Sequence, residues 1–239
     1  MRAREIHPRA GGVASSTPPD QGGGGGAGPT PALHACDVRI AVIPQAAARA
    51  LTERWHYLGT MPAGTKLALG AFLADRLIGA VTFGVGPMSG HRLLRAARPQ
   101  DGITLTRFVL LPERPPNSAS RMLGVILRML RRETDKKFVL TYADPEHGHH
   151  GGIYQAVGFT YLGPSEPQPA LDLGDGVPRH SRSVASAFGT HSREHFARHG
   201  LAVRAVPVAA KHTYLWVVPE WRDRLLVAPY PYPKRGDAA

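Results

Sequence analysis

The sequence predicts an α/β domain in which helices lie on both faces of one sheet. The first reason is the order of apolar patterns, because segments typical of strands are interleaved with segments of helical periodicity. The second reason is size, because 239 residues with 43% apolar composition can build one sizeable core. These features exclude a small disulfide-stapled protein and a wholly disordered chain.

The first half of the domain contains a strand, a helix and a hairpin. Alternating apolar residues predict a strand over 38–42, and an Ala-rich pattern predicts a helix over 45–55 that runs into Trp55-His56-Tyr57. Two apolar segments, 66–73 and 76–85, read as strands joined by a tight turn at 74–76. This order places the Trp-His-Tyr segment between the first helix and the hairpin.

The second half alternates strands and helices. A strand over 104–111 is stopped by prolines, and after residues 117–120 an amphipathic helix begins. Its predicted apolar stripe consists of Met122, Val125, Ile126, Met129 and Leu130. The remaining predicted elements are a strand over 138–142, a short helix over 153–157, a strand over 159–162 and a final strand over 214–218.

Two segments stand apart from this pattern. Residues 1–36 include Gly22 to Gly26 uninterrupted, and we expect this Gly/Pro-rich leader to be disordered because it cannot bury enough apolar surface. Residues 37–235 are then expected to form a single domain. Within it, residues 164–190 are rich in Gly, Pro and Ser, and we expect a long loop insertion there.

The charge of the chain indicates a polyanionic partner. Lys and Arg number 29 against 18 Asp and Glu, so the net charge is +11 and the isoelectric point is near 10.4. The leader holds three arginines and two acids, which leaves about +10 on residues 37–239. A positive field of this size favours nucleic acid among the possible partners.

Cysteine content and hydropathy bound the cellular setting. The single Cys36 excludes an internal disulfide and a cysteine-ligated zinc site within one chain, which is compatible with a reducing compartment. No apolar run approaches the roughly 18 to 20 residues of a membrane span, and the N-terminus lacks a signal-peptide core. We therefore expect a soluble intracellular protein with no membrane partner.

The turn between the 104–111 strand and the following helix is a candidate phosphate site. Unpaired amides and the positive end of the helix dipole are expected to point into this loop. Ser118 or Ser120 can cap the helix or bond the phosphate, and Arg114 and Arg121 flank it. The alternative is a proline-punctuated turn with an ordinary serine cap.

The element order and this turn together resemble the GNAT superfamily of N-acetyltransferases. Tyr154 strengthens the resemblance, because Gly158-Phe159 follows it four residues later. The resemblance implies a central mixed, mostly antiparallel sheet flanked by helices, a tyrosine that protonates a leaving thiolate, and acetyl-CoA or another acyl donor. The loop lacks the two glycines of the usual superfamily pattern. The implied cofactor-binding residues are Asn117, Ser118, Ser120 and Arg121.

A narrower resemblance covers residues 40–235. The segments that carry it are Trp55-His56-Tyr57, Leu105-Thr106-Arg107-Phe108, Tyr142-Ala143-Asp144-Pro145, Gly148-His149, Gly151-Gly152-Ile153-Tyr154-Gln155-Ala156 and Lys211-His212-Thr213-Tyr214. Together they resemble the Mom DNA-modification proteins of bacteriophages. The resemblance implies a GNAT-like enzyme that converts adenine in phage DNA to N6-carbamoylmethyladenine and protects it from host restriction. It also implies a phage- or prophage-encoded protein in the cytoplasm of the bacterial host.

The candidate catalytic residues are His56, Tyr57, Asp144 and Tyr154, which a GNAT-like fold brings to one cleft. The exocyclic amine of adenine is a poor nucleophile, so a base must remove its proton, and Asp144 or His56 can serve. Tyr154 can act as the acid or orient the donor, and Tyr57 can stack on or hydrogen-bond the adenine. The alternative is that all four residues have packing or turn-forming roles.

The histidines raise the question of a metal. His147, His149 and His150 are close in sequence, and His191, His195 and His199 repeat every four residues. The reading that we favour is a basic helix surface near DNA phosphates and no metal. The alternative is a metal, iron among the candidates, on His56, Tyr57 and Asp144, a set slightly preferred over the His191 helix.

The expected partner is double-stranded DNA with the adenine flipped out, because the N6 atom is paired inside a duplex. Phosphate contacts are expected from Arg107, Arg128, Arg132, Lys136 and Lys211. Two other functions stay open. One is an acyl-CoA-dependent N-acetyltransferase that acts on a small amine or a protein, and the other is a non-catalytic DNA-binding protein on a degenerate GNAT scaffold.

Overall fold

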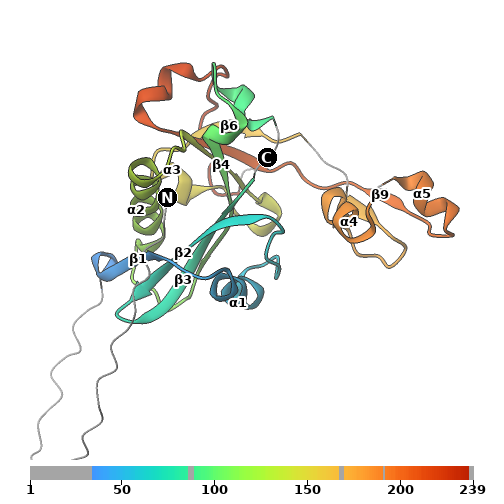
Figure 1. Cartoon of the computed structure of the whole chain (residues 1–239), viewed down its shortest axis with the longest axis horizontal. Helices are drawn as coiled ribbons and strands as arrows, with labels where there is room; N and C mark the ends of the chain where they lie inside the picture. Colours follow the sequence, from blue (N-terminus) through green and yellow to red (C-terminus); the bar gives the residue numbers. More distant parts are fainter. Residues whose placement is uncertain (1–33, 86–88, 167–169, 191, 237–239) are drawn as a thin grey trace, which may run out of the picture. The chain divides into compact units, whose positions relative to one another are not determined.

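The computed structural model describes residues 34–85, 89–166, 170–190 and 192–236. In this part of the chain, a seven-stranded sheet has the order β1-β2-β3-β4-β5-β10-β6, and every pair is antiparallel except β4 and β5 (Figure 1). The predicted α/β class with a mixed, mostly antiparallel sheet is therefore confirmed. Most of the predicted leader lies outside the described residues. The strands are β1 Val38–Val42, β2 Thr65–Leu73, β3 Arg76–Gly84, β4 Gly102–Leu110, β5 Phe138–Ala143, β6 Thr160–Pro164 and β10 His212–Val217.

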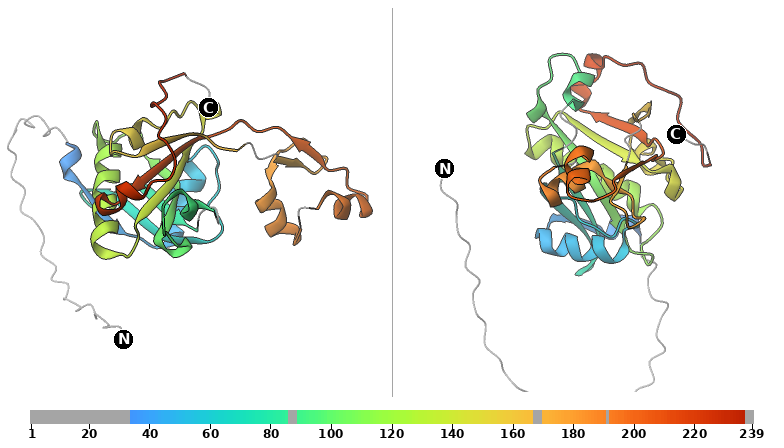
Figure 2. Two further views of the ribbon diagram at one scale, coloured as in Figure 1. Left: turned by 90° about the horizontal axis from the view of Figure 1, so that it is seen from above. Right: turned by 90° about the vertical axis from the view of Figure 1, so that its right-hand side faces the viewer.

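Helices cover both faces of this sheet (Figures 1 and 2). Helix α1, Gln45–Trp55, packs on the face that carries Ala68 and Ala80. Helices α2, Ser118–Glu133, and α3, Gly152–Gln155, pack on the opposite face, which carries Leu69 and Val81. The split follows from the alternation of side chains along β2 and β3. Within the described residues, no helix is long and apolar enough to cross a membrane.

Helix α2 contributes the largest helical share of the core. Its fully buried side chains are Met122, Leu123, Ile126, Leu127 and Leu130. The predicted stripe is thus rotated slightly, because Leu123 and Leu127 are buried while Val125 and Met129 are only partly buried. Each full burial of such a side chain contributes about 1.5–3 kcal/mol, so this helix is firmly anchored to the sheet.

The sheet opens between β4 and β5. These strands pair in parallel only over their first residues, Gly102–Thr104 with Phe138–Leu140, and the Thr141 hydroxyl then donates to the Leu105 carbonyl at 3.3 Å. Beyond this point the described residues show no further pairing between the two strands. The opening separates the chain that leaves β4 toward α2 from the chain that leaves β5 toward Asp144.

The segment expected to be a long loop contains regular structure. Strands β7 Ala170–Asp172 and β8 Arg179–His180 and helix α4 Ser181–Phe188 lie within 164–190. Beyond it come α5 Arg193–Arg198 and β9 Arg204–Val206, and β9 completes a small sheet of order β8-β7-β9. Leu171, Val184 and Phe196 form its core. Two- and three-residue strands leave almost no sequence pattern, which is why composition alone indicated a loop. We call residues 166–210, between β6 and β10, the inserted lobe.

Candidate active site

Two adjacent strands bring Asp144 and Lys211 together. In the antiparallel pair of β5 and β10, Ala143 lies opposite His212. Asp144 follows Ala143 and Lys211 precedes His212, so these two residues face each other just beyond the end of the pair. The Lys211 Nζ atom lies 2.7 Å from Asp144 Oδ2. Sequence order alone separates these two residues by the whole inserted lobe.

Asp144 is a buried and ionised carboxylate. Its side chain is 5% exposed, the Glu146 amide donates to Oδ1 at 3.2 Å, and His147 Nδ1 lies 3.6 Å from Oδ2. Burial alone raises the pKa of Asp144, but the hydrogen bond and charge of Lys211 outweigh burial and hold this pKa below its ordinary value. The side chain therefore accepts hydrogen bonds at neutral pH and donates none.

His56 follows the last residue of α1 and is a neutral imidazole. The Leu58 amide donates to His56 Nδ1 at 3.1 Å, so the ring proton resides on Nε2. Burial, followed by the positive charge of Arg107, lowers the pKa of His56 to about 4. At neutral pH this side chain can donate a hydrogen bond through Nε2 but has no free ring nitrogen to accept a proton.

Tyr57 contacts two imidazole rings. Its ring centroid is 4.3 Å from that of His56 and 4.0 Å from that of His147, at interplanar angles of 28° and 31°. Burial and the nearby Asp144 charge raise the pKa of Tyr57 to about 12, which keeps its hydroxyl protonated.

His147 and His149 also lie beside Tyr57, although neither was named from the sequence as a catalytic residue: both were weighed as metal ligands, and His149 was given as part of the family resemblance. His149 lies 5.3 Å from Tyr57 between ring centroids, and both histidines come from the loop that η4, Pro145–His147, begins. Their position directly after Asp144-Pro145 was the signal that could have placed them beside the site. Burial lowers the pKa of His149, so it too is neutral at physiological pH.

Arg107 lies near His56 and Tyr57 rather than on an outer surface. Its Nε donates to the Thr60 carbonyl at 2.9 Å and its Nη1 to the Thr106 carbonyl at 2.7 Å, which ties β4 to the chain after α1. Burial lowers its pKa, and within the described chain no ion pair joins Arg107 to a carboxylate. A partly desolvated cation of this kind offers its charge to a ligand.

Tyr154, like Asp144, is buried, but its ring packs in the apolar core. It is 7% exposed, and its ring packs 5.3 Å from Phe159 and 5.4 Å from Tyr214 between centroids. Burial raises its pKa, and Thr141, whose hydroxyl donates to the Leu105 carbonyl at the opening between β4 and β5, acts on the Tyr154 hydroxyl. Tyr154 therefore lies inside the core beside the opening, whereas His56, Tyr57 and Asp144 form the cluster at its edge.

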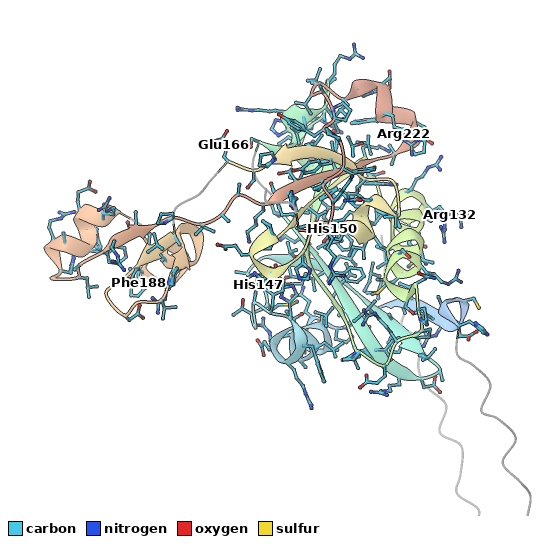
Figure 3. The ribbon with its side chains drawn as sticks, turned by 180° about the vertical axis from the view of Figure 1, so that it is seen from behind. Arg132, His147, His150, Glu166, Phe188 and Arg222 are labelled. Carbon is cyan, nitrogen blue, oxygen red and sulfur yellow. The ribbon has the colours of Figure 1, made fainter. Side chains whose placement is uncertain are left out.

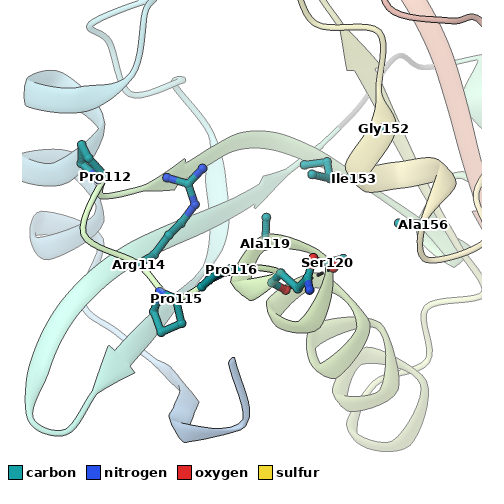
Figure 4. Close-up of a pocket in the computed structure, with 10 residues that line it drawn as sticks. Pro112, Arg114, Pro115, Pro116, Ala119, Ser120, Gly152, Ile153 and Ala156 are labelled. Atoms are coloured by element: carbon teal, nitrogen blue, oxygen red, sulfur yellow. Dashed lines mark hydrogen bonds between the residues drawn. The ribbon is translucent and has the colours of Figure 1, made fainter. Parts of the chain in front are cut away.

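A cavity of about 470 Å³ lies at the start of α2, against α3 (Figure 4). Of the four predicted cofactor residues, Asn117 and Ser120 line it. Ser118 is buried and donates its hydroxyl to the Pro115 carbonyl at 2.7 Å, and Arg121 reaches the Cys36 carbonyl. The lining is completed by Pro112, Arg114, Pro115, Pro116, Ala119, Gly152, Ile153 and Ala156.

Three of the predicted DNA contacts lie away from the cluster. Arg128 and Arg132 are exposed on α2, on the other side of the sheet from α1, and Figure 3 shows Arg132 well apart from His147. The Lys136 ammonium donates to the Gln100 carbonyl at 2.6 Å. Only Arg107 and Lys211, of the five predicted phosphate contacts, join the cluster.

The described residues contain no group of three or more His, Cys, Asp or Glu side chains arranged to hold a metal. In the alternative set, Lys211 holds Asp144 and the Leu58 amide donates to His56 Nδ1, so two of the three side chains are already engaged by protein partners. In the second set, His195 and His199 have ring centroids 4.4 Å apart, and His191 lies outside the described residues.

The mixed sheet, its opening between β4 and β5, and the cavity at the start of α2 define a GNAT-like α/β protein. The chain belongs to the Mom protein family, whose model matches residues 37–234. It is 29% identical over 133 residues to the methylcarbamoylase mom of Escherichia phage Mu, a match that spans 54% of this chain and about half, 55%, of that protein.

Solved structures with a similar fold include a synthase and an acetyltransferase. The N-acyl amino acid synthase FeeM from uncultured soil microbes is 18% identical, with a TM-score of 0.43 over 79% of this chain and 94% of that one. The IAA acetyltransferase from Bacillus cereus ATCC 14579 is 10% identical, with a TM-score of 0.44 over 76% of this chain and 99% of that one.

Proposed function

We propose that this protein is a DNA-modifying transferase that acts on the N6 amine of adenine and forms N6-carbamoylmethyladenine, which protects phage DNA from host restriction. Membership of the Mom family supports a DNA-modification role. The observation that carries the finer proposal is the buried, ionised Asp144, paired with Lys211 and surrounded by hydrogen-bond donors.

The cluster is complementary to the hydrogen-bonding edge of adenine. That edge presents one donor, the N6 amine, beside one acceptor, N1. Asp144 supplies the acceptor for the amine, and His56 Nε2 or the Tyr57 hydroxyl supplies a donor for the ring nitrogen. Guanine and thymine place a carbonyl oxygen where adenine has its amine, so the Asp144 carboxylate repels them. Cytosine has the same donor and acceptor order but a smaller ring.

Asp144 is the base in this scheme. The N6 lone pair is delocalised into the purine, so attack on a donor carbon is productive only if the N6 proton leaves as the new bond forms. Bond formation makes that proton strongly acidic, and a carboxylate of low pKa is then able to accept it. His56 is not the base, because its Nδ1 accepts from Leu58 and its pKa is about 4.

The cavity at the start of α2 is the proposed site for the anionic part of an acyl-type donor. First-turn amides of a helix lack intrahelical acceptors, and the Arg114 side chain borders the same cavity. These residues fit the phosphates of a coenzyme-A-type carrier. Such a carrier would have to bear the whole carbamoylmethyl group, so that N6 displaces it from the methylene carbon, because acetyl-CoA itself would give N6-acetyladenine. Tyr154, kept protonated by burial at the opening, then gives a proton to the leaving group.

DNA contacts follow from the position of the cluster. A flipped adenine brings its flanking phosphates to the mouth of the site, and we assign one of them to Arg107, whose charge has no carboxylate partner among the described residues. Arg128, Arg132 and Lys136 are too far around the sheet for that role, so they can contact only more distant duplex. Binding is expected to weaken steeply with salt.

Mass spectrometry of nucleosides tests the proposal. Plasmid DNA from cells that express the protein is digested and compared with DNA from cells that carry an empty vector. Carbamoylmethylated deoxyadenosine, with deoxycytidine unchanged, supports the proposal. Consumption of acetyl-CoA by the purified protein without DNA, and no altered deoxyadenosine, supports the N-acetyltransferase alternative. Salt-sensitive DNA binding with neither activity supports the non-catalytic alternative.

A further inference from the structure

The inserted lobe is closed by two hydrogen bonds between Ser165 and Lys211. The Ser165 amide donates to the Lys211 carbonyl at 2.8 Å, and the Lys211 amide donates to Ser165 Oγ at 3.0 Å. Ser165 directly follows β6 and Lys211 directly precedes β10. We call this pair of bonds the neck, because the chain of the lobe leaves and returns through it.

Lys211 contributes its backbone to the neck and its side chain to the active site. Lys211 is about one-third exposed, and its ammonium lies 2.7 Å from Asp144 Oδ2, whose side chain is almost fully buried. Oδ1 of the same carboxylate accepts from the Glu146 amide. Burying a carboxylate costs free energy unless it is paired and hydrogen-bonded. The orientation of the Asp144 side chain therefore depends on the position of the Lys211 ammonium.

Three other titratable groups face Asp144. His147 Nδ1 lies 3.6 Å from Oδ2, which is longer than a hydrogen bond, and His149 and Tyr57 act on it through space. Tyr57 is protonated and His149 is neutral at physiological pH. Among the described residues, Lys211 is thus the side chain that forms a close ion pair with the carboxylate.

We propose that Lys211 and Ser165 are positioning residues for Asp144, and that the neck couples the inserted lobe to the active site. The neck fixes the backbone of Lys211, and the Lys211 ammonium fixes the carboxylate that takes the proton from adenine. This inference rests on the proposed function. It also replaces the expected phosphate contact of Lys211, because an ammonium occupied by Asp144 does not neutralise DNA.

Steady-state kinetics with purified full-length variants separates positioning from DNA binding. We expect Lys211→Met to lower kcat by about 100-fold with the DNA dissociation constant and its salt dependence unchanged, and Lys211→Arg to restore most of the activity. Ser165→Ala removes one neck bond and is expected to lower kcat by about 3- to 10-fold. Lys66→Met, an exposed lysine on β2, and Ser192→Ala, within the lobe but outside the neck, are the matched controls.

The opposite pattern overturns the inference. If Lys211→Met leaves kcat at saturating DNA unchanged but weakens binding and reduces the salt slope by about one, Lys211 is a phosphate contact. Equal activity of Ser165→Ala and wild type removes the role of the neck.

A double-mutant cycle tests the link without any activity. The urea midpoints of wild type, Asp144→Asn, Lys211→Met and the double variant are compared. Non-additive shifts are expected from the pair, and additive shifts contradict it. If the cycle shows coupling while no modified deoxyadenosine is formed by wild type, the proposed function fails and the Asp144–Lys211 link stands.

Discussion

Gly102 begins the short paired stretch of β4 and β5, and Gly102→Ala is expected to destabilise the protein. A Cβ atom at this position would overlap Cζ and Cε2 of Phe138 and lie 2.8 Å from Cε1, all within one ring of the neighbouring strand. The backbone at Gly102 has φ −109°, which alanine adopts without strain, so the effect is purely steric. Phe138 is itself buried and has little room to move.

The expected cost is about 3 kcal/mol, the upper part of the range for overpacking a core. Urea unfolding followed by circular dichroism measures it. The matched control is Gly124→Ala in α2, where the new Cβ meets Arg128 and Val157 at ordinary contact distances and is expected to stabilise by about 0.8 kcal/mol. Adding Phe138→Leu to Gly102→Ala should recover part of the loss. A Gly102→Ala midpoint equal to wild type would refute the packing of β4 on β5.

Other predictions concern charge and catalysis. The pKa of His56 falls from 6.5 to about 4 on folding. The free energy of unfolding is therefore expected to decrease as the pH is lowered from 6.5 to about 4, by about 1–2 kcal/mol once solvent screening is allowed for. His56→Gln should flatten that decrease in urea titrations at a series of pH values. Asp144, whose pKa is also lowered, adds a second loss at lower pH, as its carboxylate is protonated. Tyr154→Phe is expected to keep the thermal midpoint within a few degrees yet reduce kcat at least 10-fold, and unchanged kcat would remove its acid role. Arg107→Gln should reduce the salt slope of binding to a short duplex by about one, whereas Arg132→Gln, which can contact only more distant duplex, should leave that slope unchanged.

The alternation and periodicity of the sequence located the main elements because these depend on local burial patterns. The first helix was predicted over 45–55 and lies there, and the hairpin over 66–85 differs from β2 and β3 by one residue at each end. The strands of the inserted lobe were missed, because two- or three-residue strands carry too few residues for a pattern.

The site was only partly predictable for a related reason. Asp144 and Tyr57 could be named as chemically capable groups, but the pairing of Asp144 with Lys211 depends on the register of β5 with β10 across an insertion of more than forty residues. The tautomer of His56 depends on one backbone amide, that of Leu58, and residue types do not reveal such a contact. Sequence therefore named candidates, whereas their roles required three-dimensional geometry.

The most direct test of the central claim compares modified deoxyadenosine formed by wild type, Asp144→Asn and the exposed-site control Asp175→Asn on the same plasmid. Asp144→Asn keeps the shape of the side chain but removes its charge and basicity, so the account predicts at least a 100-fold loss of product with DNA affinity retained. Asp175→Asn is predicted to match wild type. Full product from Asp144→Asn would contradict the account.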